Sequence, residues 1–276
     1  MAKKNTNEMS FLDHLEDLRW LLVRSCAVIV IMGLITYFFN EIIFDDIIFG
    51  PTSPNFITYK FFCEVAQTLG ITGDICVKEL PFTIQNTSME GQINVLIWTC
   101  ITAGFILAFP YILYELWRFI SPALYQKEKK NALVFIVVSS ILFFLGVLFG
   151  YFIIVPLSIN FVATFSVSSV VKNEFNLDSY IGMIKTSVIA AGLFFELPII
   201  IYFLAKLGLV TPNFLRKYRK YAVVILLIIA AIVTPPDVVS QITVAVPMLL
   251  IYEASIWIAV IVEKNKKKDG QVSAGV

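Results

Sequence analysis

The chain has 276 residues, of which 58% are hydrophobic and only 15% are charged, with a formal net charge of +1. Its mean hydropathy is +0.83. Because the charged share of an ordinary soluble domain is about 25%, this composition excludes a soluble globular protein. It indicates an all-α protein that crosses a membrane several times, and we expect no nucleic acid among its partners.

Apolar stretches long enough to cross a bilayer as helix, about 20 residues, follow one another along the chain. The stretches predicted to be membrane helices are approximately residues 20–39, 93–114, 132–156, 180–207, 221–234 and 238–262. The fifth covers only about 21 Å at 1.5 Å per residue. We therefore expect a single polytopic membrane domain over residues 1–262 with six helices, and a flexible basic cytoplasmic tail over residues 263–276.

Lysine and arginine set the orientation, because cytoplasmic loops carry an excess of both. With the N-terminus in the cytoplasm, nearly all of the 21 Lys and Arg residues fall on the cytoplasmic side. The exceptions are Lys60, Lys78 and Lys172 outside, and Lys185 within a span. The pattern predicts a multi-pass protein of the cytoplasmic (inner) cell membrane with both termini inside.

The first outer loop, about residues 43–90, is the one large hydrophilic region and contains Cys63 and Cys76. It would face an oxidising compartment, where disulfides persist. A disulfide between these cysteines would close a loop worth about 3 kcal/mol in the chain-entropy model, and two free thiols are the alternative. Cys26 and Cys100 lie in predicted spans and are expected to pack as small apolar residues.

Catalytic chemistry has little support in the sequence. The only histidine is His14, in the N-terminal segment, so an intramembrane Ser-His pair and a two-histidine metal motif are both excluded. We expect no metal, no cofactor and no enzymatic activity, and therefore a role in binding or transport.

Two ionisable residues lie within the fourth predicted span. Glu196 falls near its middle, where an acid costs about 2.5–3.5 kcal/mol on insertion scales and normally faces a cavity or a partner. Pro198 removes the amide that would bond the Phe194 carbonyl, so a kinked, partner-facing notch is expected there. The alternative is a protonated Glu196 bonded to a neighbouring helix. Lys185 is close enough to the outer end to snorkel to the interface.

Acidic residues precede the first span, where a membrane protein normally has cations. Helical spacing places Phe11, Leu15, Leu18 and Leu22 on one apolar stripe. The helix is expected to begin after Ser10, with Asp13 near its cap and Glu16 and Asp17 exposed at the membrane surface. Complementation of the helix dipole is the simpler explanation, and it accounts for Asp13 better than for Asp17.

Four motifs, in order, resemble those of the TatC family, the multispanning receptor subunit of the twin-arginine protein translocase. They are FLDHLEDLR (residues 11–19), WRFISPALY (117–125), FELP (195–198) and TPPDVVSQ (234–241). The resemblance covers nearly the whole chain apart from the N-terminal few residues, the lysine-rich tail and the outer loop around residues 52–80. It implies six helices arranged as a cupped wall with both termini in the cytoplasm.

The resemblance also implies a function: binding the twin-arginine signal peptides of folded cargo proteins at the cytoplasmic face. Export would then be driven by the proton-motive force, in a complex with single-span TatA-like and TatB-like subunits and other copies of the same chain within the lipid bilayer. The signal-binding carboxylates of the family correspond to Asp17 and Glu128, supported by Arg19, Phe119 and Tyr125. Since the family most often has Glu where this chain has Asp17, the adjacent Glu16 could share the work.

The remaining motif positions also carry over. Glu196, followed by Pro198, corresponds to the family's intramembrane acid. The outer hairpin between the fifth and sixth helices comprises Pro235, Pro236, Asp237 and Gln241, with Asp237 as its acid. Carboxylates suit the signal because they bind guanidinium groups through bidentate, charge-assisted hydrogen bonds that lysine cannot reproduce.

Two other classes of function fit parts of the sequence. A secondary transporter for a small solute would use Lys185 and Glu196, but such folds usually contain internal repeats, and none is evident in the sequence. A purely structural scaffold for other membrane subunits would leave the cytoplasmic acids dispensable.

Overall fold

The structure is a computed structural model that describes residues 11–68, 70, 76, 80–121, 132–168, 170, 172–234 and 238–273. These residues form two compact units, which are described one at a time. Unit 1 comprises Met1–Asn40 and Ile93–Ile141, and unit 2 comprises Glu41–Gln92 and Leu142–Val276.

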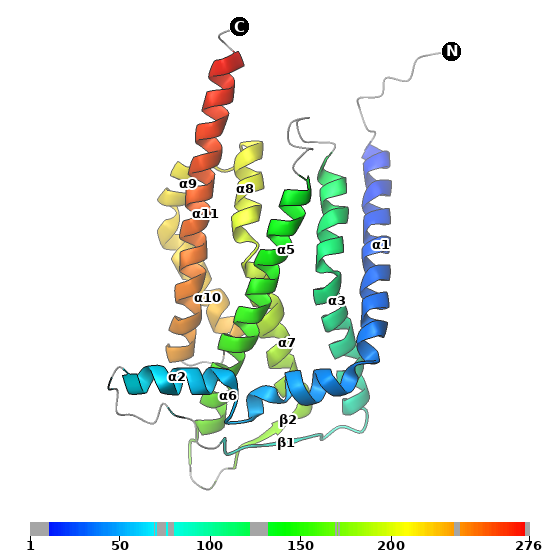
Figure 1. Cartoon of the computed structure of the whole chain (residues 1–276), viewed down its shortest axis with the longest axis vertical. Helices are drawn as coiled ribbons and strands as arrows, with labels where there is room; N and C mark the ends of the chain where they lie inside the picture. Colours follow the sequence, from blue (N-terminus) through cyan, green and yellow to red (C-terminus); the bar gives the residue numbers. More distant parts are fainter. Residues whose placement is uncertain are drawn as a thin grey trace. The chain divides into compact units, whose positions relative to one another are not determined.

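Unit 1 is built on two long helices, α1 (Phe11–Tyr37) and α3 (Gly91–Ile120), together with the first part of α5 (Ala132–Phe149). Figure 1 shows α1 and α3 side by side. They touch where a Cβ on Gly104 would come within 2.6 Å of the Gly33 nitrogen and the Ile29 carbonyl oxygen. Only glycine allows two backbones to approach this closely, as is common between helices in membranes.

Unit 2 contains the outer segment and most of the later helices. Its short elements before α3 are the π-helix η1 (Ile42–Ile48), the 3-10 turn η2 (Gly50–Thr52), the helix α2 (Ile57–Thr68) and the strand β1 (Thr83–Gln85). After α5 follow η4 (Gly150–Ile154), α6 (Val155–Thr164), β2 (Glu174–Asn176), α7 (Leu177–Phe194), α8 (Leu197–Leu207), α9 (Pro212–Lys217), α10 (Arg219–Val233) and α11 (Val238–Ser273).

The core of unit 2 forms where α8 and α10 pack on α11, around buried residues such as Ala230, Val244 and Met248. A second close contact joins α5 to α7, because a Cβ on Gly146 would meet the Ala191 carbonyl oxygen at 2.6 Å. β1 and β2 form a two-stranded parallel sheet in which Ile84 pairs with Phe175.

Five stretches among the described residues are long and apolar enough to cross a membrane. They are Leu15–Tyr37, Gly91–Ile120, Leu133–Thr164, Leu177–Leu207 and Gln241–Lys266. The all-α, multi-pass membrane architecture expected from the sequence is therefore confirmed. α10, which covers the predicted fifth span, has 15 residues, so the count of six helices and the orientation stay predictions.

The third predicted span continues beyond its expected end at Pro156. α5 passes through the π-helical turn η4 into α6, which extends to Thr164. Pro156 lies in the first turn of α6, directly after η4, and the Phe152 carbonyl four residues before it accepts a hydrogen bond from the Thr58 hydroxyl. The helix therefore passes through Pro156 without ending there.

The fourth predicted span is broken as the sequence indicated. α7 ends at Phe194, and Glu196 precedes α8, whose first turn contains Pro198. The Glu196 carbonyl accepts hydrogen bonds from the amides of Ile199 and Ile200, both at 3.0 Å. The helical hydrogen bonds of α8 thus begin at the Glu196 carbonyl.

Two hydrophilic segments contain regular structure. α11 continues through Ser273, into the segment from residue 263 whose flexibility stays a prediction. The outer loop predicted over residues 43–90 contains η1, η2, α2 and β1.

The α1–α3 contact can be tested with two Gly-to-Ala substitutions. We expect Gly104→Ala to destabilise the protein by about 1–3 kcal/mol, as overpacked positions do, because its Cβ would meet backbone atoms of α1. Gly182→Ala in α7 is the matched control, since a Cβ there has nothing within 4 Å. Thermal unfolding in detergent would compare the two, and equal melting temperatures would contradict the close contact.

Candidate functional site

The N-terminal part of α1 lies beside the C-terminal part of α3 within unit 1. Two contacts establish that the helices run antiparallel: Gly33 with Gly104, and Arg24 with Glu115. Seven residues make about two helical turns, or about 10.5 Å. Asp17 therefore lies two turns beyond Arg24 on the same face of α1, near the end of α3.

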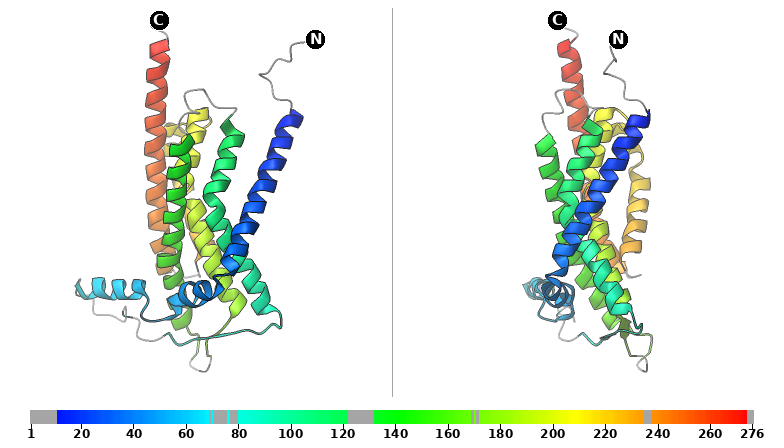
Figure 2. Two further views of the ribbon diagram at one scale, coloured as in Figure 1. Left: turned by 45° about the vertical axis from the view of Figure 1, so that its right-hand side comes forward. Right: turned by 90° about the vertical axis from the view of Figure 1, so that its right-hand side faces the viewer.

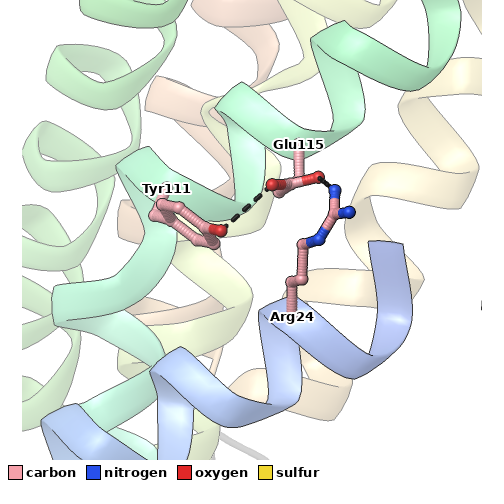
Figure 3. Close-up of polar contacts among 3 residues, drawn as sticks. All are labelled: Arg24, Tyr111 and Glu115. Atoms are coloured by element: carbon pink, nitrogen blue, oxygen red, sulfur yellow. Dashed lines mark hydrogen bonds and ion pairs between the residues drawn. The ribbon is translucent and has the colours of Figure 1, made fainter. Parts of the chain in front are cut away.

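An ion pair joins α1 to α3 below this end. Arg24 Nη1 lies 3.4 Å from Glu115 Oε2, and the Tyr111 hydroxyl donates to Glu115 Oε1 at 3.0 Å, as Figure 3 shows. The Glu115 side chain is 5% exposed, whereas that of Arg24 is 40% exposed. Both carboxylate oxygens thus have a donor in an otherwise apolar region, where a buried charge needs such partners.

The carboxylates of Glu16 and Asp17 near the start of α1 have different surroundings. Glu16 forms an ion pair with Arg19 at 3.6 Å, and both side chains are largely exposed. Two guanidinium groups lie over the Trp20 ring, that of Arg19 at 5.4 Å and that of Arg24 at 5.9 Å from the ring centroid. Asp17 is exposed on the surface of α1, whereas Glu16, predicted to assist it, is engaged by Arg19.

The end of α3 carries the first residues of the second motif. The helix continues through Ile120, so Trp117 and Phe119 are helical and not in a loop as the predicted span boundary at 114 implied. Trp117 is 8% exposed, and its ring centroid lies 4.8 Å from that of Phe135 in α5. This contact fixes the start of α5 against the end of α3.

The predicted partner acid Glu128 and the predicted supporting residue Tyr125 lie outside the described residues. The structure nonetheless constrains where their segment begins and ends. Residues 122–131 connect Ser121, at the end of α3, to Ala132, at the start of α5. Both of these ends belong to unit 1, as does Asp17.

The predicted intramembrane positions lie in unit 2. Glu196 is 6% exposed at the break between α7 and α8, and Pro198 beside it is buried. Lys185 is half-buried, on α7. Lys185 lies on α7, whereas Glu196 lies beyond the end of that helix, so the continuous-helix spacing that placed the two residues on one side does not apply.

Only one residue of the predicted outer hairpin can be placed. The side-chain amide of Gln241 on α11 donates to the Leu227 carbonyl of α10 at 3.1 Å. Pro235, Pro236 and Asp237 lie outside the described residues.

The outer segment contains a disulfide between Cys63 and Cys76, whose Cα atoms are 4.7 Å apart. Cys63 lies in α2. Cys26 and Cys100 are free thiols, the first exposed and the second buried. Among the described residues, no group of three or more His, Cys, Asp or Glu could hold a metal ion.

Comparison with known proteins decides the family. The model of the family described as "Sec-independent protein translocase protein (TatC)" matches residues 13–247. The chain belongs to the TatC family. It is 43% identical to a TatC from Blattabacterium sp. subsp. Periplaneta americana, over 96% of this chain and 100% of that protein. It is 33% identical to TatCy of Bacillus subtilis, over the full length of both proteins.

Solved structures agree with this assignment. The chain matches a crystal structure of the twin-arginine translocase receptor TatC with a TM-score of 0.67 and 32% identity, covering 91% of this chain and 99% of that one. A structure of TatC in the detergent DDM matches with a TM-score of 0.71 and 34% identity, covering 89% and 99%. The resemblance inferred from the four motifs is confirmed: this is a TatC protein, a component of the Sec-independent translocase.

Sequence reasoning missed the Arg24–Glu115–Tyr111 cluster of this TatC protein. Arg24 was counted only among the Lys and Arg residues on the cytoplasmic side, and Glu115 fell just beyond the predicted end of its span. A signal was nonetheless present, because Tyr111 and Glu115 are four residues apart and share a helix face. An acid that continues an apolar helical run without a break calls for a partner on a neighbouring helix.

The ion pair between α1 and α3 can be tested against a second pair. We expect Glu115→Ala to destabilise the protein by about 1–3 kcal/mol, because it leaves the Tyr111 hydroxyl and the half-exposed Arg24 without their acceptor. Glu253→Ala is the matched control: Glu253 binds Arg219 across α10 and α11 at 2.8 Å, but the side chains are 39% and 51% exposed. We expect less than about 1 kcal/mol there.

Unfolding in increasing dodecyl sulfate would measure both losses. The double variant with Arg24→Glu and Glu115→Arg should recover part of the stability lost in either single variant. Equal losses for Glu115→Ala and Glu253→Ala would contradict the difference in burial as the controlling factor.

Proposed function

We propose that this chain is the signal-peptide receptor and core subunit of a twin-arginine translocase. In this proposal it lies in the cytoplasmic (inner) membrane with six helices and both termini in the cytoplasm. The observation that carries the proposal is the exposed Asp17 at the end of the paired helices α1 and α3, in a chain of the TatC family. One crystal structure that it resembles is described as that of the twin-arginine translocase receptor.

The proposed recognition depends on two acids from separate segments. Asp17 projects from α1, and Glu128 belongs to the connection between α3 and α5. Each carboxylate can accept two parallel hydrogen bonds from one guanidinium group. Because lysine offers a point charge and no planar fork, two such acids distinguish two arginines from two lysines. Tyr125 and Phe119 supply aromatic surface beside this site.

Arg19 has a defined part in this proposal. Its charge would repel an incoming arginine, but the ion pair with Glu16 offsets it. The pair also keeps the two charges on the side of α1 next to Trp20. Glu16 therefore acts through Arg19, and Asp17 is the carboxylate that meets the signal.

Partner subunits are proposed to pack near the intramembrane polar residues. TatA-like and TatB-like single-span helices and further copies of this chain would pack over the break at Glu196 and Pro198, whose own side chains are buried within this chain, or would contact the hairpin of Pro235, Pro236, Asp237 and Gln241. α10 is the proposed fifth membrane helix, with 15 residues and a length of about 22 Å. A helix shorter than the hydrocarbon core thins the bilayer around it, which would ease the passage of folded cargo driven by the proton-motive force.

The transporter alternative has less support. Lys185 lies on α7 and Glu196 lies at the break beyond its end, and the family is that of a protein translocase component. A flux assay for small solutes in reconstituted vesicles separates the two functions, because a receptor subunit should catalyse no flux.

The proposed site predicts the effect of reversing either acid. Asp17→Lys and Glu128→Lys should each abolish cross-linking to a peptide that carries a twin-arginine signal, because the guanidinium groups then meet a cation. Asp46→Lys makes the same charge change at an exposed acid of η1 and should leave cross-linking unchanged. Membrane insertion is checked in parallel by protease protection.

A peptide in which both arginines are replaced by lysine provides the second arm. It should fail to cross-link to the unmodified protein. Normal cross-linking of the twin-arginine peptide by both charge-reversed variants would refute the assignment of Asp17 and Glu128.

A further inference from the structure

The outer helix α2 lies crosswise to α11 in unit 2, as both views in Figure 2 and the view in Figure 1 show. Side-chain hydrogen bonds hold it against the end of the third span. The Thr58 hydroxyl donates to the Phe152 carbonyl at 2.5 Å, and the Tyr59 hydroxyl lies 3.1 Å from the Pro156 carbonyl. Phe56, just before α2, stacks on Phe152 with ring centroids 5.9 Å apart.

The Tyr59 hydroxyl keeps its proton at physiological pH. Tyr59 is 5% exposed, and this burial raises the pKa of its hydroxyl above the ordinary tyrosine value. The hydroxyl therefore stays protonated and keeps donating. The hydrogen bonds of Thr58 and Tyr59 therefore set the position of α2 along the third span.

α2 has three faces. Thr58 and Tyr59 lie on the buried face. Next to it runs an apolar stripe at helical spacing, formed by Ile57, Phe61 and Val65, which are 64%, 60% and 36% exposed. The remaining side of the helix carries the exposed polar residues Lys60, Glu64 and Gln67. The stripe is too apolar to be explained as a water-facing surface.

The depth of α2 follows from the length of the span that holds it. Leu133–Thr164 has 32 residues, about 48 Å as helix, and the hydrocarbon core is about 30 Å thick. A centred span therefore projects about 9 Å beyond the core at each end. Phe152 and Pro156 lie about 18 Å and 12 Å before Thr164, which places α2 about 3–9 Å inside the hydrocarbon boundary.

The surface beside α2 is apolar as well. Leu145, Leu148 and Phe152 are 51%, 49% and 37% exposed along one side of α5 and η4. Through Phe56 this lipid-facing side continues directly to Ile57 at the start of α2. The stripe of α2 thus extends a surface that the span already presents to acyl chains.

We propose that α2 is an interfacial helix, with Ile57, Phe61 and Val65 inserted among the lipids of the adjacent leaflet. Amphipathic helices of this kind lie in the plane of the membrane with the apolar face about 5–10 Å below the headgroup boundary. The polar face with Lys60 and Glu64 stays at the headgroups. α2 then anchors the outer end of unit 2 at a set depth, independently of any signal peptide.

Photo-cross-linking in liposomes tests this placement. A benzophenone amino acid would replace Phe61 in one variant and Gln67 in another, in purified full-length protein reconstituted in phosphatidylcholine and phosphatidylglycerol. Benzophenone inserts into nearby C–H bonds, so mass spectrometry distinguishes lipid adducts from protein cross-links. We expect a lipid-adduct yield at position 61 several-fold higher than at position 67.

The pair Val65 and Lys60, about 140° apart around the helix, repeats the comparison if a change at position 61 impairs folding. Equal lipid yields on the two faces would overturn the proposal. So would dimeric products at positions 61 and 65, because a second copy of the chain would then cover the stripe.

Discussion

Helices surrounded by lipid gain no hydrophobic free energy from packing together, because acyl chains are as apolar as leucine. The fold of this protein therefore depends on close backbone contact between helices. In unit 1 the contact is that of Gly104 with Gly33, and in unit 2 it is that of Gly146 with α7 near Ala191. At each of these points dispersion acts at short range, and any side chain larger than hydrogen would separate the backbones.

Polar groups supplement this packing where the chain needs a defined register. Arg24, Tyr111 and Glu115 join α1 to α3 two turns below Asp17. Because the two helices cannot slide past each other without breaking the contact between Arg24 and Glu115, the exposed acid keeps its height relative to the end of α3. A receptor that counts two arginines requires such a fixed separation, since bidentate hydrogen bonds tolerate little displacement.

The sequence was sufficient to predict the features that depend on composition and local chemistry. Apolar length predicted the membrane spans, and Pro198 beside Glu196 predicted the break between α7 and α8. The structure differs where tertiary context decides: Pro156 lies in the first turn of α6 and ends nothing, and α11 continues through the lysine-rich segment. Glu115 was overlooked because its partner Arg24 is 91 residues away. No local pattern encodes that pairing.

The disulfide between Cys63 and Cys76 has a consequence for biogenesis. Thiols stay reduced in the cytosol and oxidise outside it, so in the proposed orientation this bond forms only after the segment with α2 has been translocated. The bond joins Cys76 to Cys63, which lies between Phe61 and Val65 in α2. In that orientation, a molecule with the disulfide has completed insertion of this segment. A gel that separates the oxidised from the reduced form would then measure the fraction of molecules that have reached the proposed topology.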